Sequence, residues 1–475
     1  MTVSFSGKKH SSYEQIFSVF TETSWEKTRD KYPQTTDNFF SGNKNQFFVL
    51  PHLNSTEFLI GVGDQFANHE IQAVANKFSY FFRNNILSAP TLLSAPVFDK
   101  YQTEEFVKGL FLGTYMYPFR KNHPVWKKGF SLVDENADPN TVRQIKTSVS
   151  ALCRGQFDAM DWLNKPANLK KNGQLSEHLK QISKKYGFSY KSYNREKCEK
   201  LGLGAFAAVN QGSATDAAFT IMEYHCKDPK AKTIGLIGKC VLFDTGGISL
   251  KNPANMHYMK SDMGGAAAVF GTMIAAAEMQ LPVNITAILP VTDNAISEKA
   301  YLPSDVVTAY NGKTIEVLDT DAEGRMTLAD ALAYLTKNYK TEALIDIATL
   351  TGSAVRMFGD SCGALFSNNN SLLEMLLQSG QKTAQRLWNL PLWDEWNDEI
   401  QSDVADFRNI SMKPVGDCIV AAKFLEHFTG GHPAWAHLDV AAMAFGKVNY
   451  SSEKAATGYG VQLFLDVLQN FAEKN

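Results

Sequence analysis

Three acidic residues and one arginine lie within the seven residues 319–325 (DTDAEGR). This segment follows a largely apolar run at residues 314–318 and precedes a helix-like run at residues 326–335. Open α/β sheets bind ligands at the carboxyl ends of their strands, where such a segment would lie. Side chains two residues apart on an extended segment point the same way, so Asp321 and Glu323 could aim at one point. A divalent cation would relieve the repulsion between their carboxylates; the alternative is a solvated acidic turn.

Two lysines and two further acids could join this pair. Asp244 follows the apolar residues 241–243 and precedes two glycines, so it would end a strand on a loop that can approach a ligand closely. Lys239 begins the same apolar run and Lys251 ends the glycine loop. Burial lowers the pKa of a lysine readily, and a neutral amine can bind a metal, although one lysine at the surface and one at the edge of the core would also fit. Asp262 precedes a helix rich in Gly and Ala, where it could simply be the N-cap.

If these four carboxylates meet, one divalent ion leaves their charge undercompensated and two ions balance it. Two metals about 4 Å apart suit hydrolysis, because they activate a water molecule and hold the reacting group. The ten histidines form no H-E-x-x-H or H-x-E pattern. An oxygen-rich site with one nitrogen ligand suits Mn, Mg or Zn. A two-metal phosphoesterase is the alternative enzyme, but sites of that kind usually include histidines.

The bulk composition describes an ordinary globular protein. The chain has 475 residues, 44% hydrophobic and 20% charged, with a net charge of -2, which argues against a nucleic-acid footprint. Its six cysteines form no C-x-x-C pair, which argues against structural zinc and against a disulfide framework. The start of the chain lacks the apolar core of a signal peptide, and no apolar stretch reaches the roughly 18 residues of a membrane span. We therefore expect a cytoplasmic protein.

Three parts are expected along the chain. Residues 1–125 predict a small mixed α/β domain that serves assembly or gating, and residues 126–168 predict a boundary followed by a connecting helix. In residues 169–475 strand-like and helix-like segments alternate, which predicts an α/β catalytic domain with a largely parallel central sheet flanked by helices. Within it, residues 204–209 are expected to form a strand and residues 216–225 a helix.

Several of these segments resemble, in order, the signatures of the leucyl aminopeptidase (cytosol aminopeptidase) family of dinuclear metallopeptidases. The matching segments are residues 238–251, 261–267 and 320–325, with further agreement at 162–168, 306–318, 348–352 and 435–441. The resemblance covers roughly residues 150–475. It implies a metal-dependent exopeptidase, a hydrolase that cleaves the N-terminal peptide bond of peptides and prefers aliphatic residues such as Leu.

The resemblance also implies a role for each residue of the cluster. Two Mn, Zn or Mg ions would bind the substrate's free amine and activate water. Their ligands would be Lys239, Asp244, Asp262, Asp321 and Glu323, with Asp244 and Glu323 bridging the two ions. Lys251 would stabilise the oxyanion. Arg325 would hold a bicarbonate ion that acts as the base, so that no histidine is needed.

The substrate pocket and the assembly are likewise implied by the resemblance. The pocket residues would be Met259, Thr349, Leu350, Gly352 and Ala441, together with Ala444. Leu350 would use its main chain, and the small or apolar side chains suit an aliphatic substrate. The family implies a homo-hexamer, a dimer of trimers, whose active sites face an inner cavity. Some bacterial relatives also bind DNA as regulators, but the near-neutral charge of residues 1–150 argues against that role.

Two positions depart from the family pattern. Asp319 stands where the family usually has Asn, which adds a charge beside the metals and puts the local hydrogen bonding in question. Thr245 stands where the family often has Ser, a change that keeps the hydroxyl group. No expected metal ligand is missing.

Overall fold

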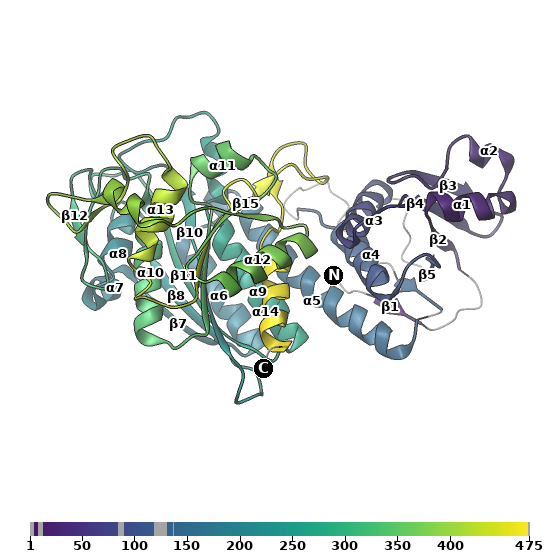
Figure 1. The fold of residues 1–475 in the computed structure, drawn as a ribbon, viewed down its shortest axis with the longest axis horizontal. Coiled ribbons are helices and arrows are strands. Elements are labelled where there is room, and N and C mark those ends of the chain that lie inside the picture. The colour runs from purple at the N-terminus through teal and green to yellow at the C-terminus, as the bar shows by residue number, and fades with distance from the viewer. Residues whose placement is uncertain (1–3, 8–12, 84–89, 118–130, 136, 474–475) are drawn as a thin grey trace. The chain divides into compact units, whose positions relative to one another are not determined.

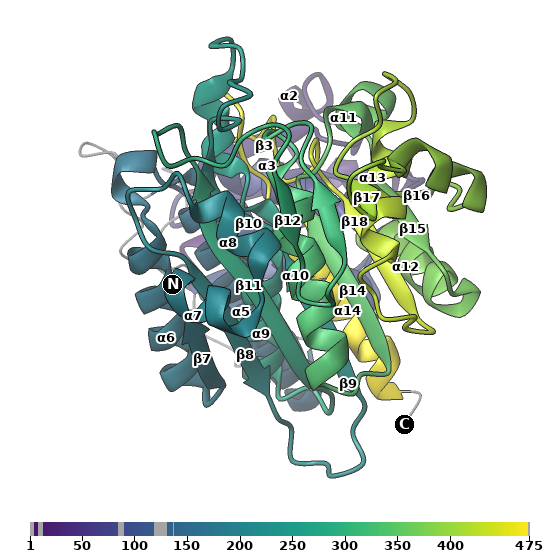
Figure 2. The ribbon, with the colours of Figure 1, turned by 90° about the vertical axis from the view of Figure 1, so that its left-hand side faces the viewer.

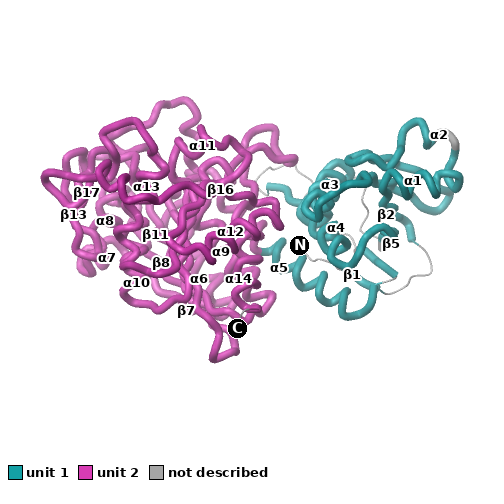
Figure 3. The backbone as a smooth tube through the Cα atoms, in the orientation of Figure 1, with its two compact units in different colours: residues 1–154 teal, residues 155–475 magenta. Residues whose placement is uncertain are grey.

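The computed structural model describes residues 4–7, 13–83, 90–117, 131–135 and 137–473 (Figure 1). The chain divides into two compact units, residues 1–154 and 155–475 (Figure 3). The division falls inside helix α5 (Pro139–Asn164), which is continuous across it. Residues 126–130 and 136 of the expected boundary lie outside the described residues.

The N-terminal unit is built on a six-stranded sheet in the order β1-β6-β5-β2-β4-β3, in which only β3 runs antiparallel to its neighbour. Phe17, Phe58 and Phe78 pack edge to face in its core, with ring centroids 5.1–5.6 Å apart. Besides the start of α5, its elements are β1 (Ser4–Ser6), β2 (Gln15–Phe20), α1 (Glu22–Thr28), η1 (Arg29–Lys31), α2 (Gln34–Asp37), β3 (Phe47–Pro51), β4 (Thr56–Gly61), α3 (Asn68–Phe82), β5 (Pro90–Ser94), α4 (Lys100–Leu112) and β6 (Ser131–Val133).

The C-terminal unit is built on a nine-stranded sheet in the order β16-β15-β18-β14-β9-β11-β8-β7, with β10 also paired to β11. Its elements up to the middle of the unit are η2 (Ala167–Leu169), α6 (Asn172–Tyr186), β7 (Ser189–Tyr193), α7 (Arg195–Leu201), α8 (Gly204–Asn210), β8 (Ala218–Tyr224), β9 (Thr233–Gly238), β10 (Cys240–Asp244), η3 (Met256–Ser261), α9 (Gly264–Met279), β11 (Asn284–Asn294), β12 (Val306–Thr308) and β13 (Thr314–Glu316). Those that follow are α10 (Glu323–Asn338), β14 (Ala343–Ala348), α11 (Gly352–Phe358), β15 (Gly363–Ser367), α12 (Asn370–Lys382), β16 (Leu387–Asn389), η4 (Asp394–Ile400), β17 (Phe407–Arg408), α13 (Asp417–Glu426), β18 (Trp435–Asp439), β19 (Phe445–Gly446), β20 (Ala455–Ala456) and α14 (Val461–Glu473).

The central strands β18, β14, β9 and β11 are parallel, whereas β8, β7 and β15 pair antiparallel toward the edges. Helices cover both faces of this sheet (Figure 2). A side chain at Gly235 would meet Leu335 of α10, whereas one at Gly238 would meet Ala266 of α9. Because these two positions of β9 differ by an odd number of residues, α9 and α10 lie on opposite faces. All six residues of β14 are buried, as expected for a strand covered on both sides. The predicted α/β class with a largely parallel central sheet is confirmed.

Two elements differ from the sequence expectation. Residues 204–210 form helix α8 instead of a strand, because the segment packs on α10 and the amide of Phe206 donates to the Asp330 carboxylate 2.8 Å away. Residues 218–224 form strand β8 instead of a helix, because they pair with β11 on one side and β7 on the other. In both cases contacts with distant segments fix the element, and the composition of each segment is compatible with it. Among the described residues, no helix has both the length and the apolar character that crossing a membrane requires.

Candidate metal centre

The ends of neighbouring strands bring the predicted acids and lysines together in the C-terminal unit. Lys239 directly follows β9, and Asp244 is the last residue of β10. Asp262 directly follows η3, and Glu323 is the first residue of α10. Carboxylate oxygens of Asp244, Asp262 and Glu323 all lie within 4.8 Å of one another, and all three residues are buried. The centre thus lies at the carboxyl edge of the parallel strands, where α/β sheets place ligands.

Each lysine joins two of the four carboxylates. The Lys239 ammonium lies 2.8 Å from Asp262 Oδ2 and 2.8 Å from Glu323 Oε1, and it also donates to the Thr349 carbonyl. The Lys251 ammonium lies 2.7 Å from Asp244 Oδ2 and contacts Asp321 as well. Two ammonium groups therefore face four carboxylates, which leaves an excess of negative charge in a largely buried site.

Burial and mutual repulsion act on these carboxylates. Burial first, and then the charges of neighbouring carboxylates, raise the pKa of Asp262 and of Glu323, although Lys239 acts in the opposite direction. The same causes raise the pKa of Asp321 to about 7. Cations would stabilise the charged forms of all three groups.

The arrangement fits divalent cations. Glu323 Oε2 is buried and has no hydrogen-bonding partner among the described residues, which is costly for a carboxylate oxygen unless a cation compensates it. The neighbouring donors are carboxylate oxygens and one lysine amine, a set that Mn, Mg or Zn accept.

Three local expectations were wrong even though the residues converge. Asp262 is not an N-cap: Met263 holds that position, and the Asp262 carboxylate accepts a 2.7 Å hydrogen bond from the Thr349 hydroxyl. Asp321 and Glu323 do not share an extended segment, because Asp321 lies in a turn and Glu323 begins α10. Burial alone would lower the pKa of Lys239, but the charges of the surrounding carboxylates outweigh burial and raise it. A neutral amine at this position therefore requires cations that take over the carboxylates.

Residues outside the predicted set hold Asp244 in place. The side-chain amide of Asn294 donates to Asp244 Oδ1 and to the Thr320 carbonyl, each over 2.9 Å. The Thr320 hydroxyl donates to the Gly246 carbonyl and accepts from the Ser249 amide, which ties the glycine loop to residues 319–325. A polar residue at the end of the apolar strand β11 was the signal that could have identified Asn294.

The two departures from the family pattern have defined contacts. The Thr245 hydroxyl donates to the Asn294 carbonyl over 2.8 Å, so the hydroxyl shared with Ser is used. Asp319 Oδ1 accepts from the Asp321 amide over 2.8 Å, a local turn contact that an asparagine oxygen could also make. Asn409 accepts from the Asp319 amide and donates to its carbonyl, and this residue was absent from the predicted set.

A buried aspartate organises the predicted substrate residues. Asp439 ends β18 and accepts from the amides of Leu350, Thr351 and Ala441, and from the Thr351 hydroxyl. The Leu350 N–H is therefore occupied by Asp439. Thr349 is joined to the centre through Asp262.

The other predicted pocket residues lie on elements next to this loop. Met259 is in η3 and accepts a hydrogen bond from the Asp262 amide through its carbonyl. Gly352 is the first residue of α11. A side chain at Gly264 would meet both Thr349 and Ala444, so these last two residues lie close together.

Arg325 lies two residues after Glu323 on α10 and is buried. Its Nη1 donates to the Asn409 carbonyl over 2.8 Å. Its Nη2 donates to the Asp417 carboxylate over 3.1 Å. Asp417 was absent from the predicted set, because it lies 92 residues further along the chain than Arg325.

Gly324 lies directly against the side chain of Lys239. A Cβ at this position would lie 2.5 Å from Lys239 Cε and 2.6 Å from its Nζ, so Gly324→Ala must displace the lysine. We expect a loss of about 10–100-fold in metal affinity, the range for changes to groups that support metal ligands. Calorimetric titration with Mn²⁺ or Zn²⁺ measures it. Gly173→Ala is the matched control, because a Cβ there meets nothing within 4 Å. Equal affinities of the two variants would contradict the assignment of Lys239 to the metal site.

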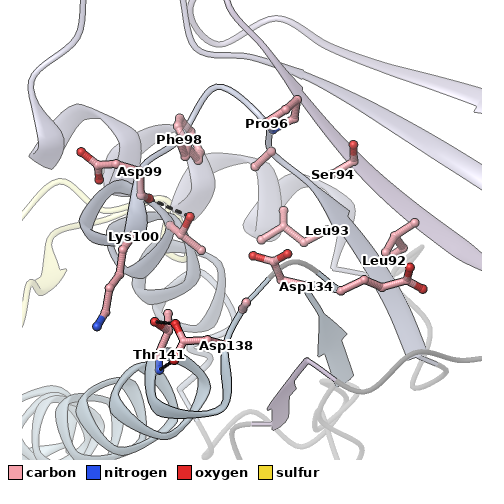
Figure 4. Close-up of a pocket in the computed structure, with 14 residues that line it drawn as sticks. Leu92, Leu93, Ser94, Pro96, Phe98, Asp99, Lys100, Asp134, Asp138 and Thr141 are labelled. Atoms are coloured by element: carbon pink, nitrogen blue, oxygen red, sulfur yellow. Dashed lines mark hydrogen bonds between the residues drawn. The ribbon is translucent and has the colours of Figure 1, made fainter.

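The N-terminal unit contains a pocket of about 400 Å³ with several acidic residues in its lining (Figure 4). Two of these acids have structural roles. Asp99 caps α4 by accepting from the Gln102 amide, and Asp138 accepts from the amides of Asn140 and Thr141 at the start of α5. Among the described residues, the acids of this pocket do not form a group of three that could hold a metal ion.

Comparisons with known proteins identify the family. The catalytic domain of the cytosol aminopeptidase family matches residues 158–465. A probable cytosol aminopeptidase of Chloroherpeton thalassium is 36% identical over 438 residues, which cover 87% of this chain and 86% of the relative. One of Chlorobaculum tepidum is 44% identical over 317 residues, covering 67% of this chain and 63% of the relative.

Among solved structures, the bottromycin maturation enzyme BotP in complex with Mn superposes with a TM-score of 0.86 at 27% identity, covering 97% of this chain and all of that one. The family match spans more than half of the chain, and the curated relatives agree with it. The chain therefore belongs to the cytosol aminopeptidase family, and it is a metal-dependent aminopeptidase, a hydrolase that acts on peptides.

Proposed function

We propose that this enzyme removes the N-terminal residue of peptides, with a preference for aliphatic residues such as Leu, using two divalent ions. The observation that carries the proposal is the buried cluster of Asp244, Asp262 and Glu323 with its two lysines. The proposed ligands of Mn, Zn or Mg are Lys239, Asp244, Asp262, Asp321 and Glu323. When bound, the ions would supply a site for the free amine and an activated water molecule.

The remaining polar residues would act on the scissile bond. Lys251 is a cation on the glycine loop with a partly exposed side chain, so it can reach a substrate carbonyl and stabilise the negative charge that develops on its oxygen. Without bound metal, burial opposes its protonation, but the charges of the neighbouring carboxylates outweigh burial and raise its pKa. Arg325 would hold an anion close to Glu323. The resemblance implies bicarbonate, which would have to displace Asp417 from the guanidinium.

Specificity would come from the residues around the Asp439 loop. Ala441 and Ala444 are small, Met259 is apolar, and Leu350 offers its carbonyl to the substrate backbone. Such a lining favours an uncharged aliphatic side chain. The proposal includes a homo-hexamer, a dimer of trimers, located in the cytoplasm, in which residues 1–125 serve assembly or gating; these features rest on the resemblance.

A pair of substrates tests the reaction. With Mn²⁺ or Zn²⁺ present, we expect release of ammonia from leucine amide and none from N-acetyl-leucine amide, because acetylation removes the amine that should bind a metal. Glutamate amide is the control for specificity and should react more slowly than leucine amide. Cleavage of the acetylated substrate at a comparable rate would contradict the aminopeptidase mechanism.

A further inference from the structure

Arg325 already has an anion from its own chain. Its side chain is 4% exposed, and its Nη2 donates to Asp417 Oδ1 over 3.1 Å. The Nε of Arg325 is buried without a hydrogen-bonding partner among the described residues. Nε and Nη2 form one edge of the guanidinium, the fork that binds a carboxylate or a similar planar anion through two parallel hydrogen bonds. That edge therefore holds one carboxylate oxygen and has one donor left.

Asp417 is supported on its own element. It is the first residue of α13, where the positive end of the helix favours a carboxylate. The preceding residue, Gly416, has a φ of 57° and allows the chain to turn into the helix. The side chain of Asp417 is 42% exposed, so it could swing to a second position or leave the guanidinium.

Asp417 also contacts the substrate loop. Its Oδ2 accepts from the Ser353 hydroxyl over 3.4 Å. Ser353 Oγ lies 3.0 Å from Thr351 Oγ1, and Thr351 donates to Asp439. The carboxylate thus lies between the guanidinium of Arg325 and the loop proposed to bind the substrate backbone.

We propose that Asp417 is the resident anion of Arg325, so that this enzyme works without bicarbonate from solution. The inference rests on the proposed function and replaces one of its parts. A carboxylate and a bicarbonate ion present the same planar O–C–O group to the guanidinium and compete for one edge. Asp417 is already in place and loses no translational freedom on binding, whereas a free ion does. In this place Asp417 takes over the task that the resemblance gives to bicarbonate, that of the base held by Arg325.

The test compares wild type with Asp417→Ala and Asp417→Asn in CO2-free buffer and with added bicarbonate. We expect the wild-type kcat for leucine amide to change less than about twofold. We expect the kcat of Asp417→Ala to rise by about tenfold or more with bicarbonate, the scale of a hydrogen bond between charged groups. Asp417→Asn keeps the shape without the charge and should respond in the same direction, which covers the case in which the alanine variant folds poorly.

Bicarbonate binding is measured separately from turnover, by NMR with 13C-labelled bicarbonate. We expect Asp417→Ala to bind at least about tenfold more tightly than wild type, because its guanidinium edge is free. Asp394→Ala is the matched control: Asp394 also pairs with a buried cation, Lys423, but is 93% exposed and outside this network. It should behave as wild type in both measurements.

Two results would overturn the inference: bicarbonate stimulating the wild-type enzyme several-fold, or wild type and Asp417→Ala binding bicarbonate equally. Failure of the proposed function gives a different pattern. In that case no variant hydrolyses leucine amide, while the difference in bicarbonate binding between wild type and Asp417→Ala persists.

Discussion

Replacing Glu323 by glutamine is expected to lower kcat/KM by about 10³-fold or more and to reduce the metal bound per subunit. Glu323 is the proposed bridging ligand, so its loss affects both ions, each of which contributes several kcal/mol to stabilising the transition state. Glutamine preserves the volume of the buried side chain and removes its charge. Steady-state kinetics with leucine amide and metal analysis of the purified protein measure the two effects.

Glu316→Gln is the matched control for this variant. Glu316, the last residue of β13, is also a largely buried, ion-paired glutamate, but its partner is Arg408. It should keep its metal content and most of its activity. If Glu323→Gln retains both ions and the wild-type rate, the assignment of Glu323 as a bridging ligand is wrong.

Replacing Lys251 by alanine is expected to lower kcat by about 10²–10³-fold, the cost of removing one group that stabilises an oxyanion. KM should change much less, because the charge that Lys251 opposes develops mainly in the transition state. Kinetics under saturating metal separate these two parameters.

Lys413→Ala provides the comparison, since this lysine is also ion-paired but exposed, with its side chain 69% accessible. It should leave both parameters unchanged. A Lys251→Ala enzyme whose defect lies entirely in KM would indicate that Lys251 binds the ground state and does not act on the oxyanion.

The sequence was most informative where chemistry depends on short motifs. The strand β10 with Asp244 at its end, and the helix α10 that begins at Glu323, were expected close to where they occur. Their spacing also placed the charged residues at strand ends, which the parallel sheet brings together. The predictions of local conformation around these residues were wrong. The position of Asp262 and the conformation of residues 321–323 depend on turns that residue type alone does not specify.

The supporting residues could not be predicted for a different reason. Asn294 reaches Asp244 across 50 positions of the chain, and Asp417 reaches Arg325 across 92. Such pairs leave no local pattern, because each residue is ordinary in its own segment. The same applies to β8, which is a strand because its neighbours in the sheet make it one.

The ion pairs of Lys239 and Lys251 bear on how this enzyme matures. Because each ammonium already joins two carboxylates, the acidic cluster is partly neutralised within the folded chain. Under the proposed ligand set, folding would not need metal to offset this charge, and metallation would be an exchange in which incoming cations displace ammonium groups and release a proton from Lys239. The supply of metal would then set how much of an already folded pool is active, and would have little influence on how much protein accumulates.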